Sequence, residues 1–184
     1  MKTLVAFVLA LALPAFAAEK DGVTHPDEVE VNGKKLVVNG LGTREATMFN
    51  VDVYVAALYV VAKTDDAGKI LWADEEKQLC LKFVHDADKS QITDAWKEGF
   101  EKNASEETVK KLQPKIDQLN GWMADIKDKD SLTFTYVPGK GLEVKVKEEV
   151  KGTIEEFEFA REFFAIWLGS EPPNDGLKKG LLGK

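Results

Sequence analysis

The most constraining feature of the sequence is a long β-rich run from Thr47 to Val61. Its first half alternates, with one face carrying Phe49, Val51, Val53 and Val55 and the other Asn50, Asp52 and Tyr54. Alternation of this kind predicts a strand with one apolar and one polar face. It weakens after Val55, which is typical of a strand that becomes covered on both faces. The run therefore predicts a long strand whose second half is buried in the domain.

Further strands are expected on both sides of this run. Residues 29–31 and 36–38 flank Asn32-Gly33, a turn pair that tolerates positive φ, and so predict a hairpin. Asn39-Gly40 and Gly42 are expected to mark the exit from that hairpin. The remaining strands are expected at residues 77–84, 132–137, 142–146 and 153–154.

The helix signals fall between and after the strands. A first helix is expected to open at Asp88 or Ser90, and a second at Ser105, with its apolar positions extending to Ile126. Pro114 should kink or split the second helix. A strongly apolar helix is expected over 157–168, followed by a short polar helix after Pro172-Pro173. This order of elements predicts an α+β domain with a mostly antiparallel sheet and helices on one face.

The first residues have the pattern of a secretory signal peptide rather than of the fold. Lys2 precedes ten consecutive apolar residues from Leu4 to Leu13, and small residues follow Pro14. Cleavage is expected after Ala17, or one residue later. The sequence thus predicts a signal peptide at residues 1–17 and a single domain at 18–184, periplasmic or secreted. No further apolar run is long enough to span a membrane.

Composition excludes several classes of protein. Four Trp and ten Phe in 184 residues are too many for a disordered chain, and one Cys cannot form an internal disulfide. The formal net charge of −7 leaves no basic surplus for nucleic acid. Cys80 lies in an apolar run, which favours a small buried hydrophobe over a reactive thiol. The oligomeric state is left open.

Three side chains are candidates for binding a ligand: Arg44, Tyr54 and Tyr59. Arg44 is one of only two Arg residues, and its planar guanidinium can hold a carboxylate in a way that Lys cannot. Tyr54 lies on the opposite parity from Val53, and its hydroxyl needs a partner. The alternatives stay open: a surface Arg at a loop tip, and Tyr side chains that only pack, an alternative that is stronger for Tyr59.

The sequence predicts neither a metal nor a cofactor. His25 and His85 lie far apart, and the segment from His85 to Asp88 is better explained as a solvated loop than as a metal site. No phosphate loop and none of the standard hydrolase, redox or zinc-enzyme motifs occurs.

At these residues the sequence resembles the chalcone isomerase-like family, in its short exported bacterial form. The pairing of a Gly-x-Arg segment with Val-Tyr, and a Trp-Leu-Gly ending, are specific in combination. The matching segments are residues 40–44, 53–59, 81–84, 92–100, 163–169 and 175–183. The resemblance implies an open-faced β-sandwich: a large antiparallel sheet, a helical layer and a pocket between them.

The resemblance also favours ligand binding over isomerase activity. Plant isomerases of the family use an Arg, a Thr, a Tyr and an Asn, which correspond here to Arg44, Tyr54 and the neighbourhoods of Ile92 and Gly99. Because Ile and Gly cannot supply that hydrogen-bond network, isomerase activity is not expected. The fatty-acid-binding members keep the Arg and place a Tyr at the Thr position, as Arg44 and Tyr54 do here.

Three hypotheses follow. The first is a non-enzymatic carrier of a small amphipathic acid such as a fatty acid, held by Arg44 and Tyr54 with its tail in an apolar pocket. The second is an isomerase or lyase in which Arg44 polarises a carbonyl. The third is a protein-binding envelope component whose pocket is filled by its own side chains, such as Trp96, Phe100 or Tyr136.

Overall fold

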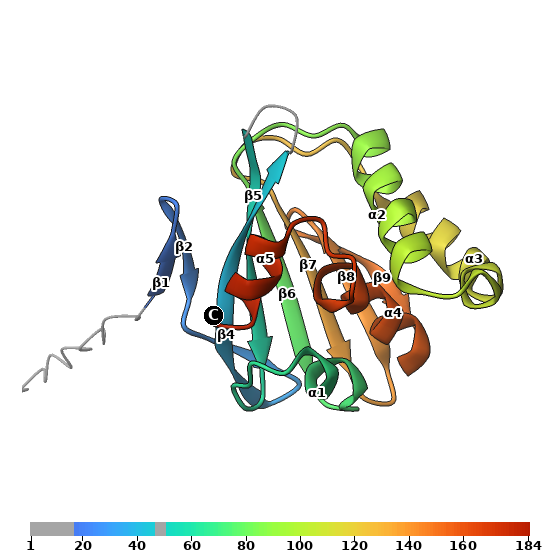
Figure 1. Ribbon diagram of the computed structural model, residues 1–184, viewed down its shortest axis with the longest axis horizontal. Helices are drawn as coiled ribbons and strands as arrows, with labels where there is room; N and C mark the ends of the chain where they lie inside the picture. The colour runs from blue at the N-terminus through green and yellow to red at the C-terminus, as the bar shows by residue number, and fades with distance from the viewer. Residues whose placement is uncertain (1–16, 47–50) are drawn as a thin grey trace, which may run out of the picture.

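The computed structural model describes residues 17–46 and 51–184. The signal peptide prediction, up to residue 16, and the predicted strand residues 47–50 lie outside this part of the chain. The architecture is a seven-stranded antiparallel sheet in which each strand pairs with the next one along the chain (Figure 1). Its strands are β3 (Glu28–Val31), β4 (Lys34–Ala46), β5 (Val51–Val60), β6 (Lys77–Phe83), β7 (Ser131–Val137), β8 (Gly141–Val146) and β9 (Glu149–Ile154).

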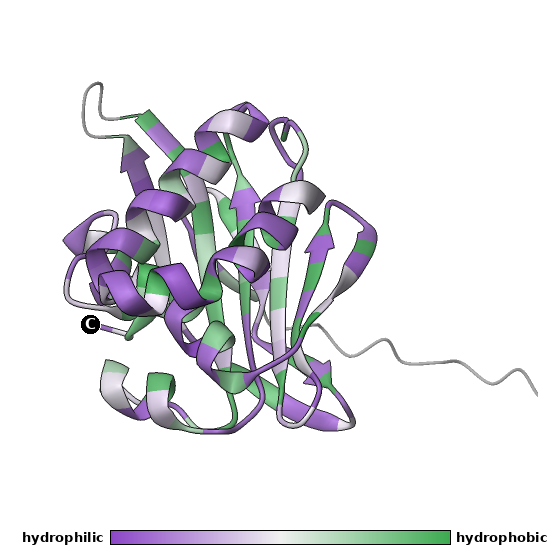
Figure 2. Ribbon diagram, turned by 90° about the vertical axis from the view of Figure 1, so that its right-hand side faces the viewer, coloured by the Kyte–Doolittle hydropathy of each residue, from purple (hydrophilic) through white to green (hydrophobic). Residues whose placement is uncertain are grey.

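The helices gather on one face of this sheet, as the sequence predicts. They are α1 (Ala67–Trp72), α2 (Lys89–Asn103), α3 (Glu106–Trp122), α4 (Phe157–Leu168) and α5 (Asp175–Leu181). Seen from the helix side, the helices in front are coloured mainly as hydrophilic residues, while hydrophobic residues continue along the strands behind them (Figure 2). The main core lies between the two layers, where α4 buries Phe163 and Trp167 against Phe134 of β7.

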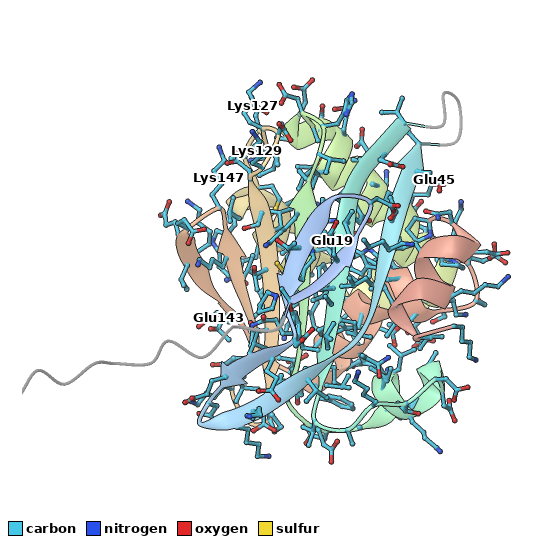
Figure 3. The ribbon with its side chains drawn as sticks, turned by 90° about the vertical axis from the view of Figure 1, so that its left-hand side faces the viewer. Glu19, Glu45, Lys127, Lys129, Glu143 and Lys147 are labelled. Carbon is cyan, nitrogen blue, oxygen red and sulfur yellow. The ribbon has the colours of Figure 1, made fainter. Side chains whose placement is uncertain are left out.

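A separate hairpin covers part of the other face of the sheet. It consists of β1 (Ala17–Lys20) and β2 (Val23–Pro26) and lies across β4, β5 and β6 (Figure 3). The sequence analysis did not predict it. Polar contacts hold it in place: Lys82 Nζ donates to the Thr24 carbonyl at 2.7 Å, and Thr43 Oγ1 donates to the carboxylate of Asp21. A smaller hydrophobic cluster, which includes Leu36 and Tyr59, lies on this side.

The hairpin of β3 and β4 turns where the sequence predicts. Val31 pairs with Lys34, so that Asn32 and Gly33 alone form the turn, with φ angles of 51° and 77°. Both values lie in the left-handed region that Asn and Gly tolerate best. The expectation for this turn is confirmed.

The expected exit at Gly40 and Gly42 is wrong, because β4 runs on to Ala46, with register shifts against β5 between Val38 and Gly40 and between Arg44 and Glu45. These glycines do not form a turn but allow the backbone of α5 to pack closely against β4. A Cβ on Gly40 would lie 2.1 Å from the carbonyl oxygen of Gly180, and one on Gly42 would lie 2.3 Å from that of Leu177. Only residues without a side chain let α5 pack directly on the backbone of β4.

The second predicted helix also differs from the structure. Helix α3 continues through Pro114 as one element, with Leu112, Ile116 and Leu119 buried on both sides of it. Burial of this face outweighs the hydrogen bond that Pro114 removes. The helix ends at Trp122, and Ile126 forms a backbone bridge with Ala87. The short helix α1 was not predicted.

Candidate ligand-binding site

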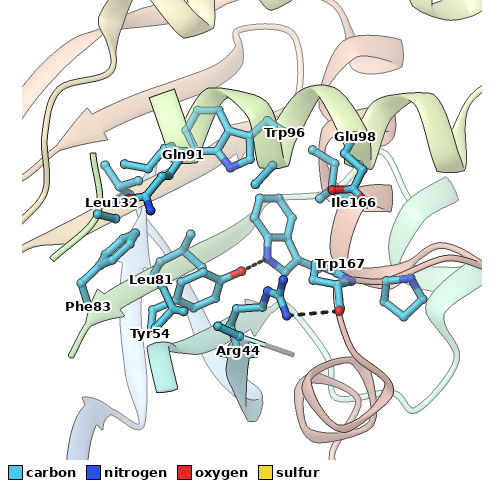
Figure 4. Close-up of a pocket in the computed structure, with 18 of the residues that line it drawn as sticks. Arg44, Tyr54, Leu81, Phe83, Gln91, Trp96, Glu98, Leu132, Ile166 and Trp167 are labelled. Atoms are coloured by element: carbon cyan, nitrogen blue, oxygen red, sulfur yellow. Dashed lines mark hydrogen bonds between the residues drawn. The ribbon is translucent and has the colours of Figure 1, made fainter. Parts of the chain in front are cut away.

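A pocket of about 550 Å³ lies between the sheet and the helical layer. Strands β4, β5 and β6 form its floor, α2 runs along its roof, and the end of α4 with the following loop closes one side (Figure 4). Its volume is within the range of small-molecule sites. The middle is apolar and is lined by Val53, Leu81, Phe83, Ile92, Trp96 and Leu132. The walls therefore suit an elongated apolar group.

Arg44 reaches this pocket from β4, where it pairs with Tyr54 of β5. Its Nη1 donates to two main-chain carbonyls, that of Glu45 and that of Pro173, the latter at 3.3 Å. Within residues 17–46 and 51–184, no carboxylate lies within ion-pair distance of this guanidinium. Arg44 is thus a pocket-lining cation that is hydrogen-bonded to main-chain carbonyls, with the carboxylate of Glu98 beyond ion-pair distance but within its electrostatic reach.

Tyr54 lies beside Arg44 and is buried, with 9% of its surface exposed. Its hydroxyl accepts a hydrogen bond from Trp167 Nε1 at 2.9 Å (Figure 4). Burial raises the pKa of Tyr54 to about 12, so the phenol stays protonated at neutral pH. Because the Trp167 bond uses an oxygen lone pair, the phenol proton remains available as a donor.

Tyr59 is not brought to the pocket. It is five residues from Tyr54 on the same strand, and successive side chains of a strand point to opposite faces. Its ring belongs to the smaller cluster under β1 and β2, and its hydroxyl donates to the Pro26 carbonyl at 2.9 Å. Tyr59 therefore has a packing role, which the sequence analysis had left open as the alternative to ligand binding.

The comparisons with known proteins agree with this geometry. The family model described as chalcone isomerase-like matches residues 17–183. The chain belongs to the chalcone isomerase-like family. Among solved structures, its fold is similar to that of a fatty-acid binding protein of Arabidopsis thaliana, with a TM-score of 0.71 and 15% identity over 91% of this chain and 96% of that one. At this identity the likeness shows the fold, and it confirms the predicted fold class. No curated protein matches the sequence.

The structure also places the two residues that the sequence analysis matched to the neighbourhoods of polar groups in the plant isomerases. Ile92 and Gly99 both come from α2. A Cβ on Gly99 would lie 2.6 Å from Cγ2 of Ile166, so a side chain at position 99 would require the Ile166 side chain to move.

The third hypothesis from the sequence requires a filled pocket. Trp96 does line the pocket of this chalcone isomerase-like domain, but it stands in its wall, edge-on to Phe134 and Phe163. Phe100 and Tyr136 are buried elsewhere in the core and are absent from the lining. The space between sheet and helices stays open.

Sequence reasoning did not identify Trp167 as the partner of Tyr54. The two residues are 113 positions apart, and the only signal was that a buried phenol needs a partner. Gln91, Phe83 and Leu132 also line the pocket without having been singled out as site residues.

The two histidines lie apart, as the sequence predicts. His25 is buried under β5, with Nε2 3.2 Å from the Val55 carbonyl, whereas His85 is exposed at the end of β6. Among the residues described, no three His, Cys, Asp or Glu side chains are grouped so that they could hold a metal ion. Cys80 is half-buried beside Thr133 rather than fully buried. None of the described helices is long and apolar enough to cross a membrane.

Proposed function

We propose that this chalcone isomerase-like domain binds a small amphipathic carboxylic acid, a fatty acid, without converting it. The carboxylate is held by the Arg44 guanidinium and the Tyr54 hydroxyl, and the tail lies along the apolar middle of the pocket. The observation that carries the proposal is a pocket-lining Arg without a carboxylate partner among the described residues, beside a buried phenol whose proton is free.

The energetics of this arrangement favour such a ligand. Charge-assisted hydrogen bonds to a carboxylate contribute about 1.5–3 kcal/mol each. Burial of the tail contributes about 0.8 kcal/mol per CH₂ group. The fold shared with a protein that is named for fatty-acid binding supports the same ligand class.

The proposal is tested by titrating the purified protein with octanoic, decanoic and dodecanoic acids in a calorimeter. Each added CH₂ should lower the Kd by about fourfold until the pocket is full. Arg44→Met keeps the apolar stem and should weaken binding by about 10- to 100-fold. Arg161→Met is the matched control, since Arg161 stacks on the exposed Trp72 outside the pocket and its loss should leave the Kd unchanged.

The enzymatic alternative makes a different prediction. The alternative is an isomerase or lyase on an unknown substrate, in which Arg44 polarises a carbonyl or stabilises an enolate, and a chalcone is the first substrate to test. The roof of the pocket offers Ile92 and Gly99 near the positions of the polar groups that this chemistry needs. We expect no turnover above the uncatalysed rate. Turnover that is abolished in Arg44→Met would replace the carrier proposal with an isomerase.

The proposal includes export to the periplasm or secretion, supported by the signal-peptide pattern of residues 1–17. N-terminal sequencing of the protein from its own host should start at Ala18 or Glu19. Native mass spectrometry of the same sample, followed by solvent extraction, should reveal a stoichiometric carboxylic acid. A protein that starts at Met1 would contradict export. An empty protein with no chain-length-dependent binding would contradict the carrier.

A further inference from the structure

One side chain of the pocket wall is also part of the main hydrophobic core. Trp96 is only 4% exposed, and it projects from α2 across the pocket from Tyr54 (Figure 4). Its ring meets those of Phe134 and Phe163 edge-on, with ring centroids 5.5 Å and 5.8 Å away. Both phenylalanines are fully buried, and neither lines the pocket. The indole therefore separates the pocket from the aromatic core behind it.

Other apolar parts of the wall are backed by main chain. Behind Leu81 and Leu132 lies the sheet itself, because these two residues pair directly across β6 and β7. Ile166 of α4 packs on the backbone of α2 at Gly99. Behind Trp96, in contrast, there are side chains. Because a core relaxes only partly around a lost side chain, removing this indole would leave a void that opens into the pocket.

We propose that Trp96 determines the length of the tail that the pocket accepts, by stopping the tail at the boundary with Phe134 and Phe163. The inference rests on the proposed function, because the carboxylate held by Arg44 and Tyr54 fixes one end of the ligand. Each added CH₂ group then carries the other end farther along the apolar wall until the indole blocks it. The residue thus sets a limiting chain length, beyond which affinity no longer rises.

The size of the indole predicts how far this limit would move. Trp96→Ala removes about nine heavy atoms, and part of that space is lost when the surrounding core relaxes. Each CH₂ group of a tail adds a single heavy atom, packed at a similar density. We expect room for about four further CH₂ groups in Trp96→Ala and for about one in Trp96→Phe, which removes about three heavy atoms.

The test titrates the native protein and both variants with saturated even-numbered acids from octanoic to octadecanoic in a calorimeter. In the native protein the Kd should fall with each CH₂ group up to the limiting length and then stop falling. In Trp96→Ala the limit should lie about four carbons further. The acid four carbons beyond the native limit should bind this variant at least about 10-fold more tightly than it binds the native protein.

Phe100→Ala is the matched control. Phe100 lies one turn further along α2 and packs on the same Phe163, but it does not line the pocket. Its removal should lower the urea midpoint, as Trp96→Ala does, because both changes leave a cavity in the core. The cavity at Phe100 has no opening into the pocket, so the limiting chain length should stay that of the native protein.

The outcomes separate the inference from the proposed function. An unchanged limit in both Trp96 variants overturns the inference, as does an equal shift in Phe100→Ala or a native protein whose affinity keeps rising to octadecanoic acid. If Trp96→Ala does not fold, the smaller shift in Trp96→Phe decides. In each of these cases, binding that depends on Arg44 leaves the proposed function intact. If the native protein binds none of the acids, the proposed function fails and the inference falls with it.

Discussion

At the scale of single residues, the site depends on one hydrogen bond between distant parts of the chain. Trp167 of α4 donates to Tyr54 of β5, and both side chains are buried. The bond satisfies the indole N–H and at the same time leaves the phenol proton for the pocket. The same contact therefore joins sheet to helix and prepares a donor next to Arg44.

Removing the Tyr54 hydroxyl should affect both stability and binding. Tyr54→Phe leaves the buried Trp167 N–H without its partner, so the free energy of unfolding should fall by about 1–3 kcal/mol. Dodecanoic acid should also bind several-fold more weakly. Urea denaturation and calorimetric titration measure the two effects.

Tyr59→Phe separates these effects, because Tyr59 lies on the other face of the sheet. Loss of its hydrogen bond to Pro26 should lower the free energy of unfolding by about 1 kcal/mol and leave the affinity for dodecanoic acid unchanged. An equal loss of affinity in both variants would show that the effect of Tyr54→Phe is structural.

At the scale of elements, α5 is fixed to β4 by close backbone contact in addition to the burial of its Leu177 and Leu181 side chains. Gly40 and Gly42 face Gly180 and Leu177, and Asn39 Nδ2 donates to the Leu181 carbonyl at 2.8 Å. A helix of seven residues is too short to be stable by itself, so its structure depends on this contact.

Gly42→Ala should therefore displace α5. The added Cβ would overlap the backbone of Leu177, and overpacking of this kind costs about 1–3 kcal/mol or more. Hydrogen exchange in residues 175–181 should accelerate, and the urea midpoint should fall. The control is Gly121→Ala in α3, where a Cβ meets nothing within 4 Å and the better helix propensity of Ala should maintain or raise stability. Unchanged exchange in α5 after Gly42→Ala would contradict the close contact.

The same elements show what the sequence could predict. The hairpin at Asn32-Gly33 and helix α4 follow from local patterns, and the structure has them at the expected positions. Gly40 and Gly42 were misinterpreted because their cause is α5, more than a hundred residues away, and a local pattern cannot distinguish a close contact from a turn.

The site residues also differ in whether local sequence patterns could predict them. Arg44 and Tyr54 came from local motif and family resemblance, and the structure places both in the pocket. Tyr59 could have been excluded by strand parity, since residues an odd number apart face opposite sides. The pairing of Tyr54 with Trp167 depends on tertiary structure and carries no local signal.

At the scale of the whole molecule, the β1–β2 hairpin adds a layer whose stability depends on pH. His25 of β2 is buried between the hairpin and β5, and burial lowers the pKa of the imidazole to about 4. Between pH 4 and 6.5 the unfolded chain binds more protons at this site than the folded chain does. The free energy of unfolding should therefore fall as the pH drops from 6.5 toward 4.

This prediction is checked by urea denaturation at several pH values between 4 and 7. The contribution of His25 is the difference between the slope of the native protein and that of His25→Asn, which cannot titrate in this range. The native protein should lose more stability than the variant on acidification. Parallel slopes would show that the hairpin leaves His25 accessible to protons in the folded state.

The contact between β4 and α5 also affects the order in which the chain can fold during synthesis. Because each strand of the sheet pairs with its chain neighbour, the sheet can assemble in the order of synthesis. The Gly40–Gly42 backbone, however, is covered only by residues that leave the ribosome much later, and Trp167 and Pro173 complete the pocket at the same late stage. A nascent chain therefore acquires most of its sheet gradually but completes its pocket in a single final step.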